Sequence, residues 1–167
     1  MYFPFSHINP ARIAITYVTL STWLIMGAFF LQIFMDIRPC ELCLWQRIPH
    51  YIVMFGAVLV PLRFLRLTFI TQAIGYFANV LLSAYHSGIE RKWWAGLEGC
   101  SSADMKNLSI AQIHERLLNT QIIKCDEIAW EFLGLSLTNY NFIICLVLGI
   151  SVLYFIGGYG EQSKSIR

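Results

Sequence analysis

The amino-acid sequence predicts an all-α membrane protein, a bundle of four transmembrane helices, from two observations. The first is composition: of 167 residues, 57% are hydrophobic and 13% are charged, against roughly 25% charged residues in soluble domains. The second is spacing, because three segments without Asp, Glu, Lys or Arg exceed the roughly 20 residues that cross a bilayer core. These segments lie between Arg12 and Asp36, between Arg66 and Glu90, and between Glu131 and Glu161. A soluble helical protein has no use for several such segments, so we expect residues 1–167 to form a single membrane domain.

The first transmembrane helix is not expected to be a cleaved signal peptide, since its apolar run is too long and no cleavage motif follows before Asp36. A further uncharged segment, from Arg47 to Arg63, is short. It reaches spanning length if its helix begins near Leu44 with Arg47 at the membrane interface. We therefore expect helices over about residues 12–35, 44–62, 67–86 and 140–159. The loops 36–43 and 87–139 then lie on the same side of the membrane.

Basic residues predict the orientation, because short cytoplasmic loops are enriched in Lys and Arg. Five of them flank the helices on the side of the termini: Arg12, Arg63, Arg66, Lys164 and Arg167. Arg91 and Lys92 argue weakly for the opposite orientation, but they begin a long loop, and long loops count less. We expect cytoplasmic termini and exoplasmic loops 36–43 and 87–139, where disulfides persist. In the cytosol the same cysteines would more often bind zinc.

The short loop carries Cys40 and Cys43, and C-x-x-C is the spacing of dithiols that cycle between thiol and disulfide. Pro39 disfavours a helix through the residue before it, so a new helix should begin around these cysteines, and its positive dipole end favours thiolate. Arg47 lies four residues after Cys43, on the same helical face, and adds a permanent positive charge. Two alternatives stay open: the pair forms a structural disulfide, and Arg47 extends to lipid phosphates. A c-type haem is excluded because Leu44 stands where histidine is required.

The long loop contains a second pair, Cys100 and Cys125, which faces the C-x-x-C from the same side of the membrane. Cys100 lies among small polar residues, which suits a sulfur that a partner thiolate attacks. A capping box at Ser109 predicts a short interfacial helix between the two cysteines, lying on the membrane or on protein. A static disulfide is the alternative for this pair and would stabilise the loop by roughly 3 kcal/mol. Cys145 is expected to be a buried apolar residue of the last helix.

The chain resembles the DsbB family of bacterial inner-membrane proteins over almost its whole length. The resemblance lies in the four predicted helices, the C-x-x-C followed by an arginine, the two loop cysteines and three sequence segments. These segments are Pro39-Cys40-Glu41-Leu42-Cys43, Tyr85-His86-Ser87-Gly88-Ile89-Glu90 and Trp130-Glu131-Phe132-Leu133-Gly134-Leu135. The resemblance implies a quinone-dependent protein-disulfide oxidoreductase of the cell inner membrane. Such an enzyme reoxidises a periplasmic DsbA-like thiol oxidase and so supports disulfide bond formation in exported proteins.

The resemblance also implies a role for each cysteine of the two pairs. Cys100 would form the mixed disulfide with a DsbA-like partner of thioredoxin fold, and Cys125 would be its resolving cysteine. Cys125 would then pass the electrons to Cys40. Cys43 would lie next to the quinone. The loop between Cys100 and Cys125 is the most variable region of the family, so the surface that docks the partner does not carry over.

The expected quinone, ubiquinone or menaquinone, would be bound by Arg47, His86 and Glu90. Arg47 matches the family arginine beside the quinone, whereas His86 and Glu90 match more loosely, and the alternative for them is a place among interfacial polar residues. No metal site is expected. Glu41 puts an acid beside the dithiol and opposes thiolate formation, so the redox potential of the family does not carry over.

Three other functions stay open. A DsbI-type paralogue with a dedicated partner shares these motifs. An enzyme like vitamin K epoxide reductase has a similar four-helix core, but its loop pair precedes the membrane C-x-x-C, whereas here the C-x-x-C comes first. A non-enzymatic membrane scaffold would have a loop stapled by a disulfide or by zinc. A net charge of +2 gives no support for a nucleic-acid partner.

Overall fold

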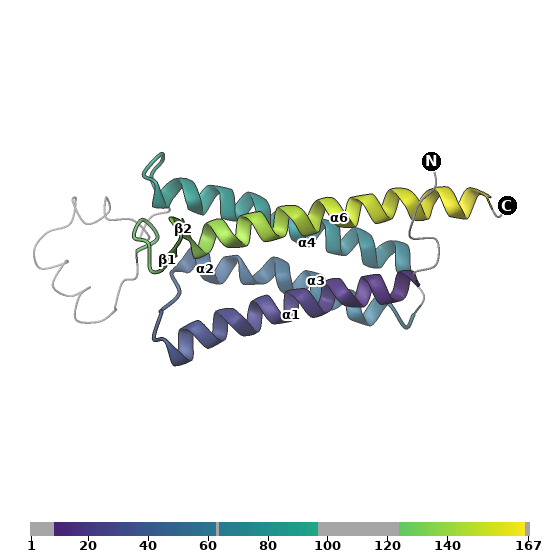
Figure 1. Ribbon diagram of the computed structural model, residues 1–167, viewed down its shortest axis with the longest axis horizontal. Coiled ribbons are helices and arrows are strands. Elements are labelled where there is room, and N and C mark those ends of the chain that lie inside the picture. The colour runs from purple at the N-terminus through teal and green to yellow at the C-terminus, as the bar shows by residue number, and fades with distance from the viewer. Residues whose placement is uncertain (1–8, 63, 97–123, 166–167) are drawn as a thin grey trace, which may run out of the picture.

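The computed structural model describes residues 9–62, 64–96 and 124–165 of the chain. Its helices are α1 (Pro10–Phe34), α2 (Glu41–Trp45), α3 (Arg47–Leu59), α4 (Leu65–Glu90) and α6 (Leu137–Ser165). Four segments of the described chain are long and apolar enough to span a membrane: Pro10–Phe34, Glu41–Leu59, Leu65–Glu90 and Leu137–Gly157. They run in alternating directions along one long axis (Figure 1). The predicted helical membrane protein with four spanning helices is therefore confirmed.

The helix boundaries differ from the expected ones near the cysteines. The second spanning helix begins at Glu41 rather than near residue 44, because the Cys40 side chain caps its first turn. The third continues to Glu90 rather than ending at residue 86, so His86 and Glu90 both lie on helix α4. The first loop therefore ends at residue 40 rather than 43, and the second begins at residue 91 rather than 87. The short interfacial helix predicted after Ser109 lies outside the described residues.

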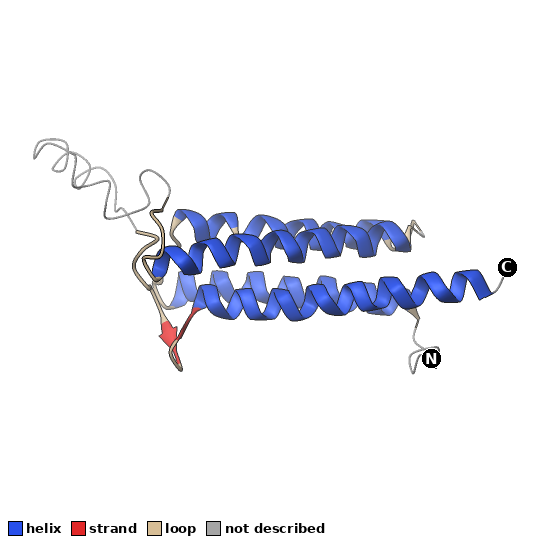
Figure 2. Cartoon of the chain, turned by 90° about the horizontal axis from the view of Figure 1, so that it is seen from above, coloured by secondary structure: helices blue, strands red, loops and turns tan. Residues whose placement is uncertain are grey.

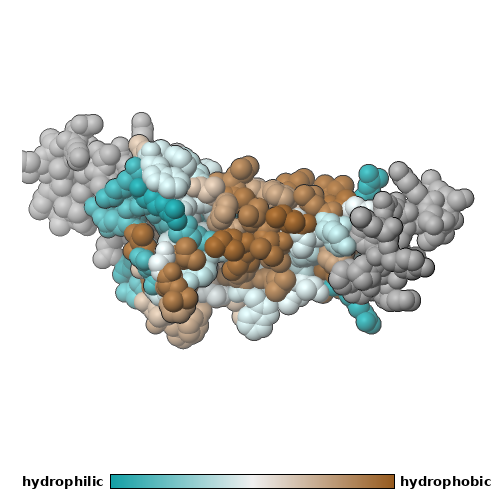
Figure 3. All heavy atoms as spheres, turned by 45° about the horizontal axis from the view of Figure 1, so that its top comes forward, coloured by the Kyte–Doolittle hydropathy of each residue, from teal (hydrophilic) through white to brown (hydrophobic). Residues whose placement is uncertain are grey.

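Helix α4 lies at the centre of the packing, between α6 and α3, and α3 in turn packs against α1. One core cluster joins all four helices through Ala14, Tyr17, Val53, Phe69, Ala73, Tyr76, Cys145 and Val152. Large apolar side chains such as Trp23, Phe34 and Leu81 are instead exposed on the outside of the bundle. Figure 3 shows hydrophobic residues gathered across the middle of the visible face and hydrophilic residues toward its ends. An apolar belt of this kind is what a lipid-facing surface requires.

A small β-hairpin, which the sequence did not lead us to expect, precedes α6. Strands β1 (Glu131–Phe132) and β2 (Leu135–Ser136) pair antiparallel, and they lie at one end of the bundle (Figure 2). The two loop residues Leu133 and Gly134 both have positive φ angles, 51° and 76°. A two-residue hairpin loop of type I′ needs positive φ at both positions, and glycine adopts it without strain. The turn brings Ser136 to the end of α4, where the cysteines lie.

Gly75 allows α3 and α4 to approach closely, since a methyl group there would lie 2.6 Å from Val53 Cγ2 and 2.8 Å from the Pro49 carbonyl oxygen. We expect Gly75→Ala to lower the free energy of unfolding by about 1–3 kcal/mol, because the helices must separate. Thermal unfolding in detergent, followed by circular dichroism, measures the change. Gly27→Ala on α1 is the matched control, because no atom lies within 4 Å of its added methyl group. Equal stability of the two variants would contradict the close packing.

Candidate active site

The C-x-x-C pair lies at the start of the second spanning helix. Cys40 is the N-cap of α2, with φ −73° and ψ 172°, and its Sγ accepts a hydrogen bond from the backbone N–H of Cys43 at 3.3 Å. The spacing of three residues brings the two Sγ atoms to 2.7 Å. Both cysteines are free thiols; Cys40 is 5% exposed and Cys43 is half-buried. The C-x-x-C spacing therefore places the two sulfur atoms side by side at the helix start.

The pKa of the Cys40 thiol is raised above its ordinary value. The hydrogen bond with the Cys43 sulfur is the main cause, and burial is the second. The helix start alone predicted the opposite direction, but its backbone hydrogen bond is a smaller effect on Cys40 than those two. The raised pKa disfavours the thiolate form of Cys40, which is the nucleophilic form of a cysteine.

Cys125 belongs to the same buried cluster as the first cysteine of the C-x-x-C. It is 0% exposed and shares a buried cluster with Cys40, Leu42 and Ile89, against which Cys43 also packs. Cys125 takes part in a disulfide, whereas Cys100 lies outside the described residues. The structure therefore brings one predicted cysteine of the long loop to the first cysteine of the C-x-x-C.

His86 on α4 lies between these cysteines and Glu90. Its ring is 2% exposed, with Nε2 at 3.6 Å from Cys40 Sγ. Nε2 also lies 4.0 Å from Glu90 Oε1, one helical turn further on. The hairpin and the start of α6 hold the Glu90 carboxylate through hydroxyl groups: Ser136 donates to Oε2 at 2.5 Å and Thr138 to Oε1 at 2.8 Å. His86 and Glu90 thus belong to a buried polar cluster at the cysteines.

Arg47 extends from α3 toward α1. Its Nη2 donates a hydrogen bond to Gln32 Oε1 at 2.9 Å, and its guanidinium carbon lies 4.7 Å from the centre of the Phe29 ring. A hydrogen bond and a cation–π contact together fix the planar group. The positive charge is therefore held at the wall between α1 and α3, one helical turn beyond Cys43.

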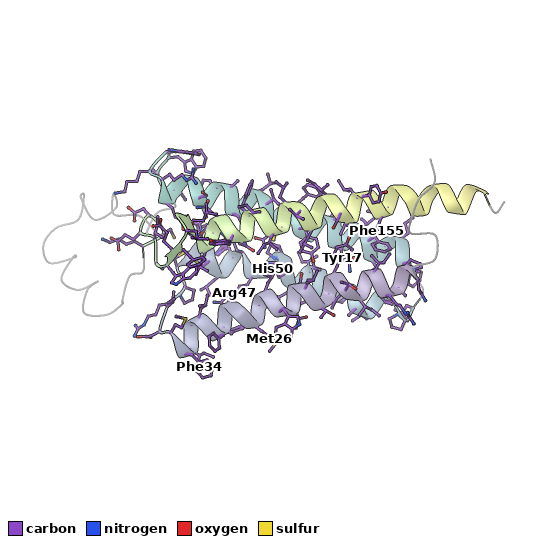
Figure 4. The ribbon with its side chains drawn as sticks, in the orientation of Figure 1. Tyr17, Met26, Phe34, Arg47, His50 and Phe155 are labelled. Atoms are coloured by element: carbon purple, nitrogen blue, oxygen red, sulfur yellow. The ribbon has the colours of Figure 1, made fainter. Side chains whose placement is uncertain are left out.

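A cavity of about 340 Å³ opens beside the cysteines. Its apolar lining residues on α1 and α6 include Trp23, Ala28, Leu31, Leu137 and Ile144. Its polar lining residues include Cys40, Cys43, Arg47, His50, His86 and Glu90. Figure 4 shows the labelled Arg47 and His50 in the region between α1 and α6. A mostly apolar cavity with a few converging polar groups is typical of a site for a small organic ligand.

Several polar residues of this site were missed from the sequence. Gln46, His50 and Asn141 line the cavity, although each lies within an apolar spanning segment. Polar side chains within membrane helices are costly and mark functional sites, so their presence in those segments was the available signal. Thr138 and Gln32 carried no such signal, because hydroxyl and amide groups near helix ends are common.

The same cluster offers donor atoms for a metal ion. One ligand atom from each of Cys40, Cys43 and His86 lies within 4.8 Å of the others, and thiolate with imidazole is a donor set that zinc accepts. Structural zinc sites have four protein ligands. The nearest further carboxylate, Glu90, is held by two hydroxyl donors. The described residues therefore supply three of the four ligands of such a site.

The raised pKa of Cys40 predicts an order of thiol modification. In a Cys100→Ser, Cys125→Ser protein kept reduced at pH 7, we expect iodoacetamide to modify Cys43 before Cys40, because the raised pKa disfavours the Cys40 thiolate. Raising the pH should then accelerate the modification of Cys40, since its folded pKa lies above the ordinary value. Peptide mass spectrometry measures both rates, and buried Cys145 is the internal control. Modification of Cys40 at pH 7 as fast as Cys43 would contradict this assignment.

The sequence was compared with known proteins. A family profile described as Disulfide bond formation protein DsbB matches residues 10–155. A protein of Rickettsia prowazekii (strain Madrid E), described as Uncharacterized protein RP370, is 30% identical over 164 residues, which cover 94% of this chain and 90% of that protein. The matched range 10–155 contains both C-x-x-C cysteines and both cysteines of the long loop. The chain therefore belongs to the DsbB family, and is a multi-pass membrane thiol oxidoreductase of the disulfide bond formation machinery.

Proposed function

We propose that this protein reoxidises a periplasmic, DsbA-like thiol oxidase of thioredoxin fold and passes the electrons to a membrane quinone. The observation that carries the proposal is the burial of Cys125 in one cluster with Cys40, against which Cys43 also packs. Thiol–disulfide exchange needs an attacking sulfur that reaches a disulfide sulfur. The presence of a loop cysteine in the buried cluster of the C-x-x-C supports exchange between the two pairs.

The exchange begins at the loop pair, in which we propose a Cys100–Cys125 disulfide. A partner thiolate attacks Cys100, a new partner–Cys100 bond forms, and Cys125 leaves as a thiolate. Cys125 then attacks Cys40 of an oxidised C-x-x-C, which forms a Cys40–Cys125 bond and releases Cys43 as a thiolate. The second partner thiolate displaces Cys100, and Cys100 in turn displaces Cys40 from Cys125. The partner has then lost two electrons and two protons, which reside on Cys40 and Cys43.

The cavity supports a quinone as the final acceptor. Its volume of about 340 Å³ lies within the range of small-ligand sites, and its apolar lining suits a lipid-soluble ring. Arg47, His86 and Glu90 would hold the polar edge of the ring next to Cys43. A bound quinone, ubiquinone or menaquinone, would take up the two electrons and two protons and become quinol, while Cys40 and Cys43 return to the disulfide.

We place the protein in the bacterial inner membrane with cytoplasmic termini. The Lys and Arg residues beside the termini support this orientation. The four spanning helices alternate in direction, so the C-x-x-C and Cys125 share the opposite end of the bundle (Figure 1). That end would face the periplasm, where disulfides persist. A DsbI-type paralogue with a dedicated partner has the same chemistry and differs only in the partner.

A metal-holding scaffold is the second candidate, because Cys40, Cys43 and His86 bring their ligand atoms together. It predicts one zinc ion per chain in reduced protein, retained through dialysis, and no quinol formation. Metal analysis beside a turnover assay separates the two functions.

Cys43→Ala should abolish turnover, because the C-x-x-C can then neither close its disulfide nor release a thiolate beside the cavity. The assay mixes purified protein, a reduced thioredoxin-fold partner and quinone, and follows quinol formation by absorbance. Cys145→Ala is the matched control, since Cys145 belongs to the core cluster of the bundle, and it should retain turnover. Quinol formation by Cys43→Ala at the native rate would exclude the proposed route.

Arg47→Ala should raise the KM for quinone about tenfold, the effect of losing one charge-assisted hydrogen bond. The turnover rate at saturating quinone should change less, because the cysteines remain in place. Arg66→Ala is the control, since Arg66 is an exposed arginine at the other end of the bundle. An unchanged KM in Arg47→Ala would confine Arg47 to anchoring in the membrane.

A further inference from the structure

A line of buried side-chain contacts runs from the interior of the bundle to the Cys40 sulfur. His50 Nε2 lies 3.2 Å from Asn141 Oδ1, and Asn141 Nδ2 lies 3.1 Å from Gln46 Oε1. Gln46 Nε2 lies 2.9 Å from His86 Nδ1, and His86 Nε2 lies 3.6 Å from Cys40 Sγ. The line crosses α3, α6, α4 and α2, so it joins helices that are separate in sequence.

The donor and acceptor atoms of the two amides determine the direction of each hydrogen bond in this line. An amide nitrogen only donates and an amide oxygen only accepts. The Gln46 nitrogen therefore donates to His86 Nδ1, and the Gln46 oxygen accepts from Asn141. Asn141 is turned the same way, with its oxygen toward His50. Each amide thus points its donor toward the cysteine, and the lone pair of His86 lies on Nδ1.

Thr138 competes with Gln46 for the same nitrogen of His86. Its Oγ1 lies 3.1 Å from Nδ1 and donates its own proton to Glu90 Oε1 at 2.8 Å. Toward Nδ1 the Thr138 oxygen is therefore an acceptor and favours a proton there. Gln46 favours the opposite tautomer and lies closer, at 2.9 Å. Beside Nε2, the Cys40 sulfur at 3.6 Å accepts a hydrogen bond when that nitrogen carries the proton, and the Glu90 carboxylate at 4.0 Å attracts the proton electrostatically. Both groups favour the same tautomer as Gln46.

We infer that Gln46 and Asn141 are positioning residues that hold the proton of His86 on Nε2, where it faces the Cys40 sulfur. Gln46 acts on Nδ1 directly, and Asn141 acts by fixing the Gln46 amide. His86 is the group that contacts the reacting sulfur. The second nitrogen of a catalytic histidine commonly sets its tautomer in this way.

The tautomer matters when a disulfide at Cys40 is cleaved. The attacking sulfur forms the new bond, the old S–S bond breaks, and its electron pair stays on Cys40 as a thiolate. A leaving thiolate with a high proton affinity leaves slowly, and an N–H donor at 3.6 Å stabilises it. That the His86 Nε2–H stabilises a Cys40 leaving group rests on the proposed function. The position of the proton on Nε2 does not rest on it.

Nitrogen-15 spectra of protein labelled at its histidine rings, in lipid nanodiscs, test the tautomer. The His86 signals are identified by their loss in His86→Phe. Wild type should carry the proton on Nε2. Gln46→Leu should increase the fraction of His86 rings with the proton on Nδ1, because the donor that opposes Thr138 at that nitrogen is lost. Thr138→Val should leave it on Nε2. A proton on Nδ1 in wild type, or a ratio of the two tautomers in Gln46→Leu equal to that of wild type, would overturn the inference.

The rate of Cys40 alkylation tests the consequence. In a Cys43→Ala background, Gln46→Leu and Asn141→Leu should each slow the alkylation of Cys40 about tenfold at fixed pH, because thiolate loses a hydrogen bond. Gln72→Leu is the matched control, since this buried amide bonds only the Ala14 carbonyl among described residues. Its rate should not change. An equal loss in Gln72→Leu would reduce the effect to general destabilisation and overturn the positioning role.

The tautomer and alkylation measurements test the positioning role, and the turnover assay tests the proposed function independently of it. If the tautomer and alkylation results hold but no quinol forms, the proposed function is wrong and the positioning role stands. If quinol forms at the native rate in Gln46→Leu and its His86 tautomer ratio equals that of wild type, the positioning role is wrong and the proposed function stands.

Discussion

The contact between the Cys40 sulfur and the His86 ring is the interaction on which the arrangement of the site depends. It joins α2 to α4, and it lies where polar groups have little access to water and must find partners within the protein. His86 satisfies that requirement through Gln46 and Thr138. Glu90 does so through Thr138 and Ser136. The hairpin and the start of α6 are therefore tied to the same point as the C-x-x-C.

The order of helix packing explains where the cavity lies. The helices pack in the order α1, α3, α4, α6, which leaves α1 and α6 as the ends of the row. Toward the termini these two helices meet through Tyr17, which bonds Ser151 at 2.9 Å and contacts Phe155. Toward the cysteines both helices contribute residues to the lining of the cavity.

Composition and charge spacing were enough to predict four spanning helices, because the bilayer fixes both length and polarity. The C-x-x-C and Arg47 were also predicted, since their spacing is local. The contact between His86 and Cys40 could not be predicted, because it depends on how α4 packs against α2. The hairpin at Leu133 and Gly134 was missed for a similar reason: two strands of two residues are too short to show a period. Gln46 and Asn141 were overlooked because the partner of each lies on another helix.

The central claim is that Cys125 and Cys40 are close enough to exchange disulfides, and one measurement tests it most directly. In a Cys43→Ala, Cys100→Ala protein, the two thiols are left without their usual partners, and mild oxidation in membranes should join them within one chain. Peptide mapping without reduction should then find a Cys40–Cys125 disulfide in most molecules. Free thiols at both positions, or disulfides only between chains, would contradict the account.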